Sequence, residues 1–125
     1  MKLTPVLPVP AIEPLLPLWE SLGFRRTAEV PHGDALGFVI LQREGAELML
    51  QTFASMREDE PRALAGSPVP GAGVLFVQVD DLAAARAALP ADVEVFVTER
   101  KTPYGATETF LRDRAGNVII LAQFG

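Results

Sequence analysis

Apolar and β-branched residues near the C-terminus fall into two short runs separated by a turn. The runs are Thr107–Arg112 and Val118–Leu121. Between them, residues 113–117 read Asp-Arg-Ala-Gly-Asn, and Asp, Gly and Asn tolerate the left-handed backbone that a short loop requires. The pattern predicts a β-hairpin, and the uninterrupted aliphatic run of the second strand is typical of a strand that is buried in a sheet.

The same succession of patterns occurs earlier in the chain. Residues 36–52 also contain an apolar run, a charged turn with a glycine and a second apolar run, so that Gly45 corresponds to Gly116. Each hairpin follows a short extended segment and a helix pattern, at residues 6–22 and 74–89. Two such copies in one small chain predict an α+β fold built from two similar modules.

Proline, glycine and polar residues bound the elements of the first copy. Leu3–Val9 is a predicted strand whose prolines cannot donate to a ladder, so it is expected at a sheet edge or exchanged with a partner chain. A helix with an apolar stripe follows; it contains Trp19 as a core anchor and ends before Gly23. The next strand is predicted at Phe24–Val30, before a turn at 31–34.

The two copies span about 1–53 and 73–125 of a single predicted domain, and residues 54–72 join them. Ser55-Met56-Arg57-Glu58 is a capping-box pattern, so a short helix is expected to start there. Residues 66–73 contain prolines and glycines and are expected to form a loop. A connection of this length favours a crossing between the modules or a lid over a pocket.

In the second copy a strand is expected at Val74–Val79. A helix follows, capped by Asp80 or Asp81, and then a strand at Val93–Thr98. The charged stretch Glu99–Gly105 is predicted to be a loop that leads into the C-terminal hairpin.

Composition excludes several classes of protein. A chain of 125 residues with 49% hydrophobic and 22% charged residues is typical of one globular domain. The absence of cysteine excludes disulfides, thiol nucleophiles and zinc–thiolate sites. The net charge of −5 disfavours nucleic acid as a partner and mildly favours cationic ligands. No apolar run is long enough to span a membrane, and N-terminal prolines interrupt any targeting segment, so a cytoplasmic protein is expected.

Several motifs, spread over nearly the whole chain, carry a resemblance to a known family. They are Lys2-Leu3-Thr4, Trp19 with Leu22-Gly23-Phe24, Pro103-Tyr104-Gly105, and Leu111-Arg112-Asp113 followed by Ala115-Gly116-Asn117. With two βαβββ modules in this order, the chain resembles the vicinal-oxygen-chelate superfamily. That superfamily includes glyoxalase I, extradiol dioxygenases and fosfomycin- and bleomycin-resistance proteins, and the pattern is most similar to the bleomycin-resistance branch. The resemblance implies curved mixed sheets around a cavity.

The resemblance also implies where a metal would bind. Enzymes of this superfamily use about three or four His, Glu or Gln ligands on inward-facing strand positions, around an open coordination site. At the matching positions this chain has Thr4, Met49, Val74 and Ile120. None of these side chains is a good metal ligand, so we expect no metal and no other cofactor.

A cavity without a metal would then be lined according to strand alternation. The predicted lining side chains are Glu47, Met49, Gln51, Phe76, Gln78, Glu108 and Phe110. An apolar and aromatic floor with a few amide and carboxylate groups is typical of a small-molecule pocket, although such side chains also occur as ordinary core. Tyr104 joins this set because the resemblance implies that the aromatic of the Pro-aromatic-Gly motif stacks on flat rings; its alternative role is to close the pocket rim.

These features favour a metal-free small-molecule-binding protein, with drug sequestration as one form of that function. The expected ligand is flat and can be cationic, with Glu108 as its charged partner, and the expected assembly is a homodimer. The alternative is an enzyme of lyase or dioxygenase type with an atypical or absent metal site, which bound divalent metal or an acid–base pair would identify. A scaffold with a filled interior is a third hypothesis.

Overall fold

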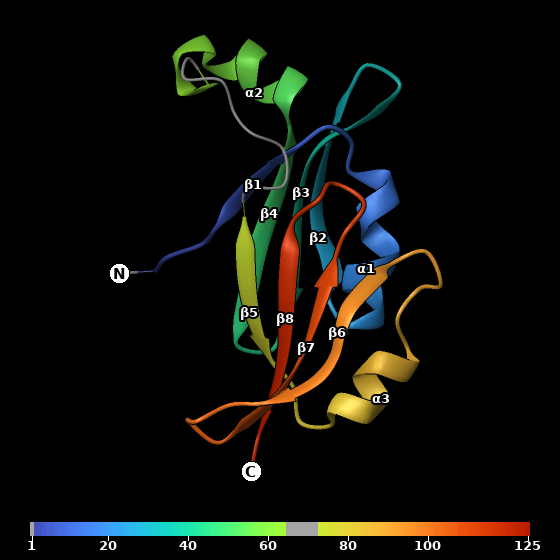
Figure 1. The fold of residues 1–125 in the computed structure, drawn as a ribbon. Helices are drawn as coiled ribbons and strands as arrows, with labels where there is room; N and C mark the ends of the chain where they lie inside the picture. Colours follow the sequence, from blue (N-terminus) through green and yellow to red (C-terminus); the bar gives the residue numbers. More distant parts are fainter. Residues whose placement is uncertain (1, 65–72) are drawn as a thin grey trace. The chain divides into compact units, whose positions relative to one another are not determined.

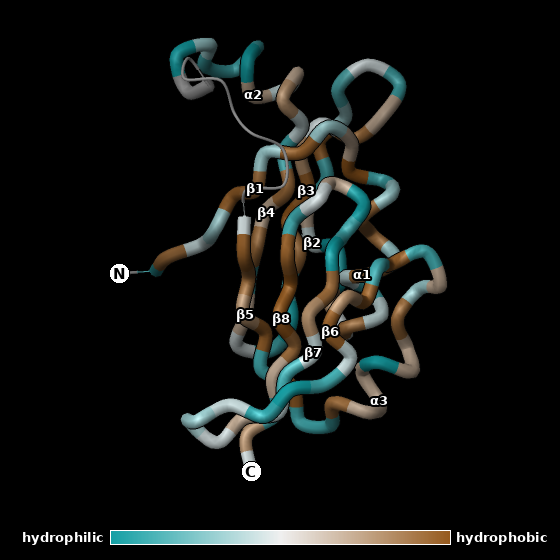
Figure 2. Tube along the Cα trace, viewed as in Figure 1, coloured by the Kyte–Doolittle hydropathy of each residue, from teal (hydrophilic) through white to brown (hydrophobic). Residues whose placement is uncertain are grey.

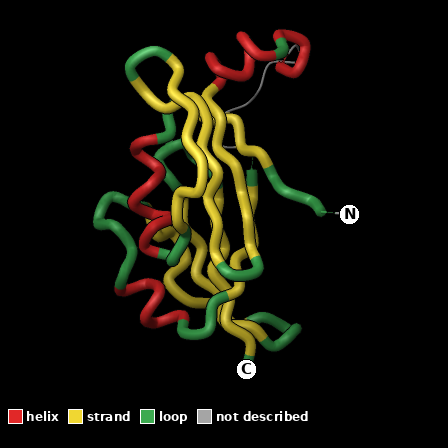
Figure 3. The backbone as a smooth tube through the Cα atoms, turned by 180° about the vertical axis from the view of Figure 1, so that it is seen from behind, coloured by secondary structure: helices red, strands yellow, loops and turns green. Residues whose placement is uncertain are grey.

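The computed structural model describes residues 2–64 and 73–125, and the chain divides into two compact units, Met1–Pro70 and Gly71–Gly125 (Figure 1). Unit 1 contains β1 (Val6–Val9), the 3-10 helix η1 (Glu13–Leu15), α1 (Leu16–Ser21), β2 (Arg25–His32), β3 (Ala35–Arg43), β4 (Ala46–Thr52), α2 (Phe53–Asp59) and the 3-10 helix η2 (Pro61–Leu64). Unit 2 contains β5 (Val74–Gln78), α3 (Leu82–Ala87), β6 (Glu94–Lys101), β7 (Ala106–Arg112) and β8 (Val118–Phe124). Each unit is thus a sheet with a few short helical segments (Figure 3).

The two sheets have the same topology. Their strand orders are β1-β4-β3-β2 and β5-β8-β7-β6. In each sheet the first strand pairs in parallel with the last, and the other neighbours pair antiparallel. This confirms the predicted α+β class and the repeat of strand, helix and three strands. The prediction that both units form one domain around a cavity stays a prediction.

The core of unit 1 consists of the helical stripe and one face of the sheet. Trp19, the predicted core anchor, is 1% exposed and packs edge-on against Phe24 at 5.2 Å between ring centroids. On the strands every second side chain is buried, as in Val39, Leu41, Leu48 and Leu50. The alternate side chains of the same strands, such as Ile40 and Met49, are only half-buried and point to the other face of the sheet.

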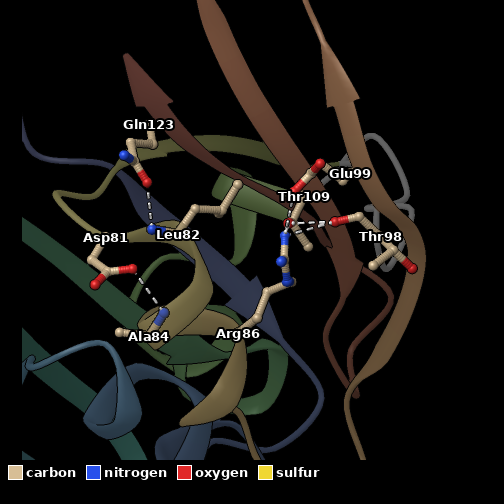
Figure 4. Close-up of polar contacts among 8 residues, drawn as sticks. All are labelled: Asp81, Leu82, Ala84, Arg86, Thr98, Glu99, Thr109 and Gln123. Carbon is tan, nitrogen blue, oxygen red and sulfur yellow. Dashed lines mark hydrogen bonds and ion pairs between the residues drawn. The ribbon is translucent and has the colours of Figure 1, made fainter. Parts of the chain in front are cut away.

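Helix α3 is fixed to the sheet of unit 2 by side-chain hydrogen bonds at both ends (Figure 4). Asp81 caps it by accepting from the Ala84 N–H at 3.0 Å, which confirms one of the two predicted caps, and Gln123 of β8 accepts from the Leu82 N–H at 2.8 Å. At the other end Arg86 donates to the Thr98 carbonyl at 3.1 Å and to the hydroxyl of the fully buried Thr109 at 3.2 Å. The helix therefore anchors on the face that carries Thr109, opposite Glu108.

Some predicted boundaries differ from the structure. The first strand begins at Val6 rather than Leu3, and it does lie at a sheet edge, paired with β4 of its own chain. Strand β2 continues through His32, because residues predicted as a turn pair with β3. Strand β6 continues through Lys101, because the predicted loop residues Arg100 and Lys101 pair with β7.

The segment between the units begins as predicted with a helix, but its cap is different. Helix α2 starts at Phe53, and the hydroxyl of Thr52 accepts from the Ser55 N–H at 3.1 Å. Ser55 therefore lies inside the helix and is not its cap. The loop predicted at 66–73 falls mainly outside the described residues.

Candidate functional site

Residues that face one another across a ladder share a face of the sheet, so the register defines the face opposite α3 in unit 2. Phe76 and Phe110 both pair with Ile120, one from each side. Gln78 and Glu108 both pair with Ala122 in the same way. The sequence-based assignment of these side chains to one face is therefore correct, including that of Glu108 and Phe110. Figure 2 shows that β8, the strand between them, is hydrophobic along most of its length.

Aromatic rings dominate this face. Phe124 lies 6.3 Å from Phe76 and 6.2 Å from Tyr104 between ring centroids, and Phe96 meets Phe110 edge-on at 5.9 Å. Four of these rings remain accessible: Phe76 is 50%, Phe96 43%, Tyr104 57% and Phe124 44% exposed. We call these five residues the aromatic face. Clusters of exposed apolar side chains of this kind are typical of binding surfaces.

A buried carboxylate lies beside the aromatic face. Glu108 is fully buried, and its Oε1 accepts from Arg100 Nε at 3.0 Å. The hydroxyl of Tyr104 donates to its Oε2. That hydrogen bond, together with desolvation and the negative charge of Glu108, raises the pKa of Tyr104. The phenol therefore stays protonated, and its ring is held against Phe124 at the C-terminal end of β8.

Two guanidinium groups lie over rings of the aromatic face. The Cζ atom of Arg100 is 4.6 Å from the ring centroid of Phe110, and that of Arg112 is 4.8 Å from the centroid of Phe96. Arg112 also donates from Nε to Glu94 at 3.2 Å. Both groups thus combine a cation–π contact with an ion pair.

In unit 1 three predicted site residues, Glu47, Met49 and Gln51, lie on the half-buried face of the sheet. Two of them, Glu47 and Gln51, form polar contacts within the unit. Glu47 accepts from the hydroxyl of Thr4 at 3.0 Å, from Lys2 Nζ at 3.1 Å and from the side-chain amide of Gln42. These contacts, led by the amide of Gln42, lower the pKa of Glu47. Gln51 donates to the hydroxyl of Ser55 at 3.2 Å.

Glu47 also lines a groove of about 560 Å³ at the end of this sheet. The other lining residues are Lys2, Leu3, Gly23, Arg25, Gln42, Arg43, Glu44, Gly45 and Ala46. Met49 and Gln51 lie outside this groove, so the structure does not gather the three predicted residues of unit 1 into one pocket.

The eight predicted site residues therefore form two groups. Glu47, Met49 and Gln51 belong to unit 1; Phe76, Gln78, Tyr104, Glu108 and Phe110 belong to unit 2. Sequence reasoning missed Phe96, Arg100 and Phe124 on the second group's face. Phe124 lies two residues beyond Ala122 on β8, so extending the predicted strand past Leu121 would have found it. Arg100 was missed because its segment was assigned to a loop.

The residues at the expected metal positions do not fit a divalent ion. The hydroxyl of Thr4 donates to Glu47, and Met49 pairs with Val6 and Ile40 in the ladder. The other two positions, Val74 and Ile120, are aliphatic. Within residues 2–64 and 73–125, no group of three or more His, Cys, Asp or Glu side chains could hold a metal ion.

The repeat of two units, each with short helices and a mixed four-stranded sheet of the same topology, defines a duplicated α+β class of protein. The chain belongs to the glyoxalase/bleomycin resistance protein/dioxygenase superfamily, whose family model matches residues 4–121. No curated protein matches it. Its described helices are all too short or too polar to cross a membrane.

Solved structures share this fold at low sequence identity. A glyoxalase/bleomycin resistance protein/dioxygenase from Nocardioides is 18% identical with a TM-score of 0.71, covering 99% of this chain and 83% of that one. A virulence protein from Salmonella typhimurium is 23% identical with a TM-score of 0.71, covering 100% and 97%. TnmS3, an antibiotic binding protein from Streptomyces sp. CB03234, is 23% identical with a TM-score of 0.67, covering 100% and 98%. At such identities the likeness concerns the fold.

Proposed function

We propose that this chain is a metal-free protein that binds a flat, largely apolar small molecule on the aromatic face of unit 2, with drug sequestration as one form of that function. In this proposal it acts in the cytoplasm as a homodimer. The observation that carries it is the exposure of Phe76, Phe96, Tyr104 and Phe124 on one face of a sheet. The name of the antibiotic-binding relative TnmS3 supports the same class of function.

Physical chemistry favours a ligand on this face. Exposed rings lose contact with water when a flat molecule covers them, and burial of apolar surface is worth about 25 cal/mol per Å². The rings need little reorganisation, because Tyr104 is held by Glu108 and Phe110 is packed between Phe96 and Arg100. Such preorganisation lowers the entropic cost of binding.

Glu108 was predicted to be the partner of a cationic ligand. In the structure its carboxylate accepts from Arg100 and from Tyr104 and is fully buried. A cation would reach it only after one of these donors moved away. The exposed rings of the aromatic face therefore favour a flat ligand. A positive charge on the ligand rests on the sequence-based prediction alone.

The test is calorimetric titration with naphthamide, a flat and uncharged probe, preceded by thermal denaturation in its presence. Binding to the native state raises the melting temperature, increasingly so as the free ligand concentration exceeds Kd. Stacking is worth about 0.5–1.5 kcal/mol beyond burial, so Tyr104→Ala is expected to weaken binding roughly tenfold. Phe76→Ala is expected to have a similar effect, since it removes an exposed ring from the same face.

Two variants serve as controls. Tyr104→Phe keeps the ring and removes only the hydroxyl, so it should retain most of the affinity. Val95 pairs with the buried Leu111, so its side chain points to the side of the sheet opposite the aromatic face. Val95→Ala should therefore leave binding unchanged. Equal affinity of wild type, Tyr104→Ala and Phe76→Ala would show that the aromatic face is not the binding site.

A further inference from the structure

The ion pair beside the aromatic face is exposed on one side only. The side chain of Arg100 is 54% exposed, whereas that of its partner Glu108 is 1% exposed. Tyr104 covers the second carboxylate oxygen by donating its hydroxyl to it. A molecule that approaches this face therefore meets the guanidinium of the pair and not the carboxylate.

Arg112 on β7 is a second exposed arginine on this face. Its guanidinium lies over Phe96, and its carboxylate partner Glu94 is itself exposed. An exposed pair of this kind contributes little and is easily rearranged, so Arg112 can turn its remaining donors to a ligand. Phe110 and Arg112 alternate with Leu111 on β7, and Arg100 of β6 pairs with Glu108 across the ladder. Both guanidinium groups therefore lie on the side of the sheet that carries the aromatic rings.

The strand spacing between Phe76 and Phe110, over which Arg100 lies, suits a small aromatic ligand. Phe110 and Phe76 flank Ile120, so they are separated by one strand, and adjacent strands lie about 4.8 Å apart. A bicyclic ring that stacks beside Phe76 and Phe124 can thus direct a substituent toward Arg100, which lies over Phe110. A planar guanidinium binds a planar carboxylate with two parallel hydrogen bonds.

We propose that the flat ligand of the aromatic face carries a carboxylate or another delocalised oxyanion, which accepts hydrogen bonds from Arg100 while its ring stacks on the exposed aromatics, and that Arg112 adds positive charge on the same face. This inference rests on the proposed function and names the chemical class of its ligand. It replaces a cation paired with Glu108 by an anion paired with Arg100. The fully buried carboxylate of Glu108 acts on the ligand only by orienting Arg100 and Tyr104.

The test compares three probes that share one ring system: naphthoate, naphthamide and naphthylmethylammonium. Wild type is expected to bind naphthoate about tenfold more tightly than naphthamide, as one charge-assisted interaction allows, and to bind the ammonium most weakly. Raised salt should weaken binding of naphthoate and leave naphthamide unchanged, because screening acts on charge alone.

Arg112→Gln is the main variant, because its ion pair is exposed and its removal leaves the Arg100–Glu108 pair intact. It is expected to weaken naphthoate severalfold and naphthamide much less, because a neutral amide loses no charge-assisted interaction. Replacing both members of the buried pair, Arg100→Met with Glu108→Gln, leaves no unpaired buried charge and should remove most of the remaining preference for the anion. Arg114→Gln, which breaks an exposed pair with Asp92 in the turn between β7 and β8, is the matched control and should change nothing.

The outcomes separate the two proposals. Binding of the ammonium as tightly as naphthoate, or an unchanged anion preference in Arg112→Gln and in the double variant, overturns the inference while the site for a flat ligand stands. Failure of all three probes to bind overturns the inference together with the proposed function.

Discussion

Tyr104 donates its hydroxyl hydrogen to the carboxylate of Glu108, four residues further along the chain. The hydrogen bond stabilises the protonated phenol and so raises the pKa of Tyr104 in the folded state. A group with a raised folded-state pKa contributes stability below its unfolded pKa, which is about 10 for tyrosine. That contribution is lost as the pH rises through the higher pKa of the folded protein.

We therefore expect the phenol of Tyr104 to titrate above the midpoint of an unfolded peptide. The chain has one tyrosine, so ultraviolet difference absorbance of the phenolate reports this group alone. Glu108→Gln should move the midpoint down, because it removes the charged acceptor. Glu94→Gln changes an exposed carboxylate on β6 and should leave the midpoint where it is. A midpoint at or below that of the peptide would show that the hydrogen bond is absent in solution.

Gly37 on β3 is a second position where contacts predict a measurable effect. A Cβ atom there would lie 2.5 Å from Cβ of His32 on β2 and 3.1 Å from Cβ of Ser55 on α2. Gly37→Ala must therefore displace a strand or a helix, and we expect a loss of about 1–3 kcal/mol in the free energy of unfolding, measured with urea.

Gly45→Ala is the matched control for this change. Gly45 has φ of +76° and open space around its added Cβ, so the cost there is left-handed strain alone, about 1–2 kcal/mol. The free energy of unfolding should fall further in Gly37→Ala than in Gly45→Ala. Only Gly37→Ala should disturb the packing of α2 on the sheet. A smaller loss in Gly37→Ala than in Gly45→Ala would contradict the close packing.

The fold was predictable because its determinants are local and occur twice. Gly45 and Gly116 mark two hairpins, and the runs around them fix which strands pair. Residue type alone limited the cap of α3 to Asp80 or Asp81, and in the structure Asp81 is the cap. The end of β6 could not be predicted in this way. Arg100 and Lys101 are residue types typical of loops, and they belong to the strand because they pair with Glu108 and Thr107 of β7.

For the candidate site of unit 2, the sequence predicted only which side chains share one face of the sheet. Alternation assigned Phe76, Gln78, Glu108 and Phe110 to the correct side of the sheet, because the side-chain period of a strand is two. Alternation gives no information on which charges are paired. The burial of Glu108 under Arg100 and Tyr104 depends on contacts between β6, β7 and their turn. These contacts leave the guanidinium of Arg100 exposed on this face and cover the carboxylate of Glu108.

Assembly gives a further prediction, a homodimer at micromolar concentration. In each sheet the strand before the helix, β1 or β5, lies at the edge with one neighbour only. Exposed edges and exposed apolar side chains such as Val6 and Val74 favour pairing with another chain. Sedimentation velocity measures this directly, and a single monomeric species at micromolar concentration would reject the dimer.

The metal content is predicted from the pairing of carboxylates. Glu108 and Glu47 are the carboxylates beside the expected ligand positions Ile120 and Met49. The first is bound by Arg100 and Tyr104, and the second by Lys2, Thr4 and Gln42. A divalent ion would have to displace these donors and would still lack further ligands, because no described cluster of acidic or imidazole groups surrounds either carboxylate.

Protein purified from metal-replete medium is therefore expected to contain far less than one divalent ion per chain by elemental analysis. Glu108→Ala and the surface variant Glu94→Ala should give the same low content as wild type. About one ion per chain in wild type, lost in Glu108→Ala and kept in Glu94→Ala, would refute the metal-free proposal. That result would place Glu108 among the ligands of a metal and favour an enzyme over a binding protein, since a metal with an open coordination site activates water or polarises a substrate oxygen.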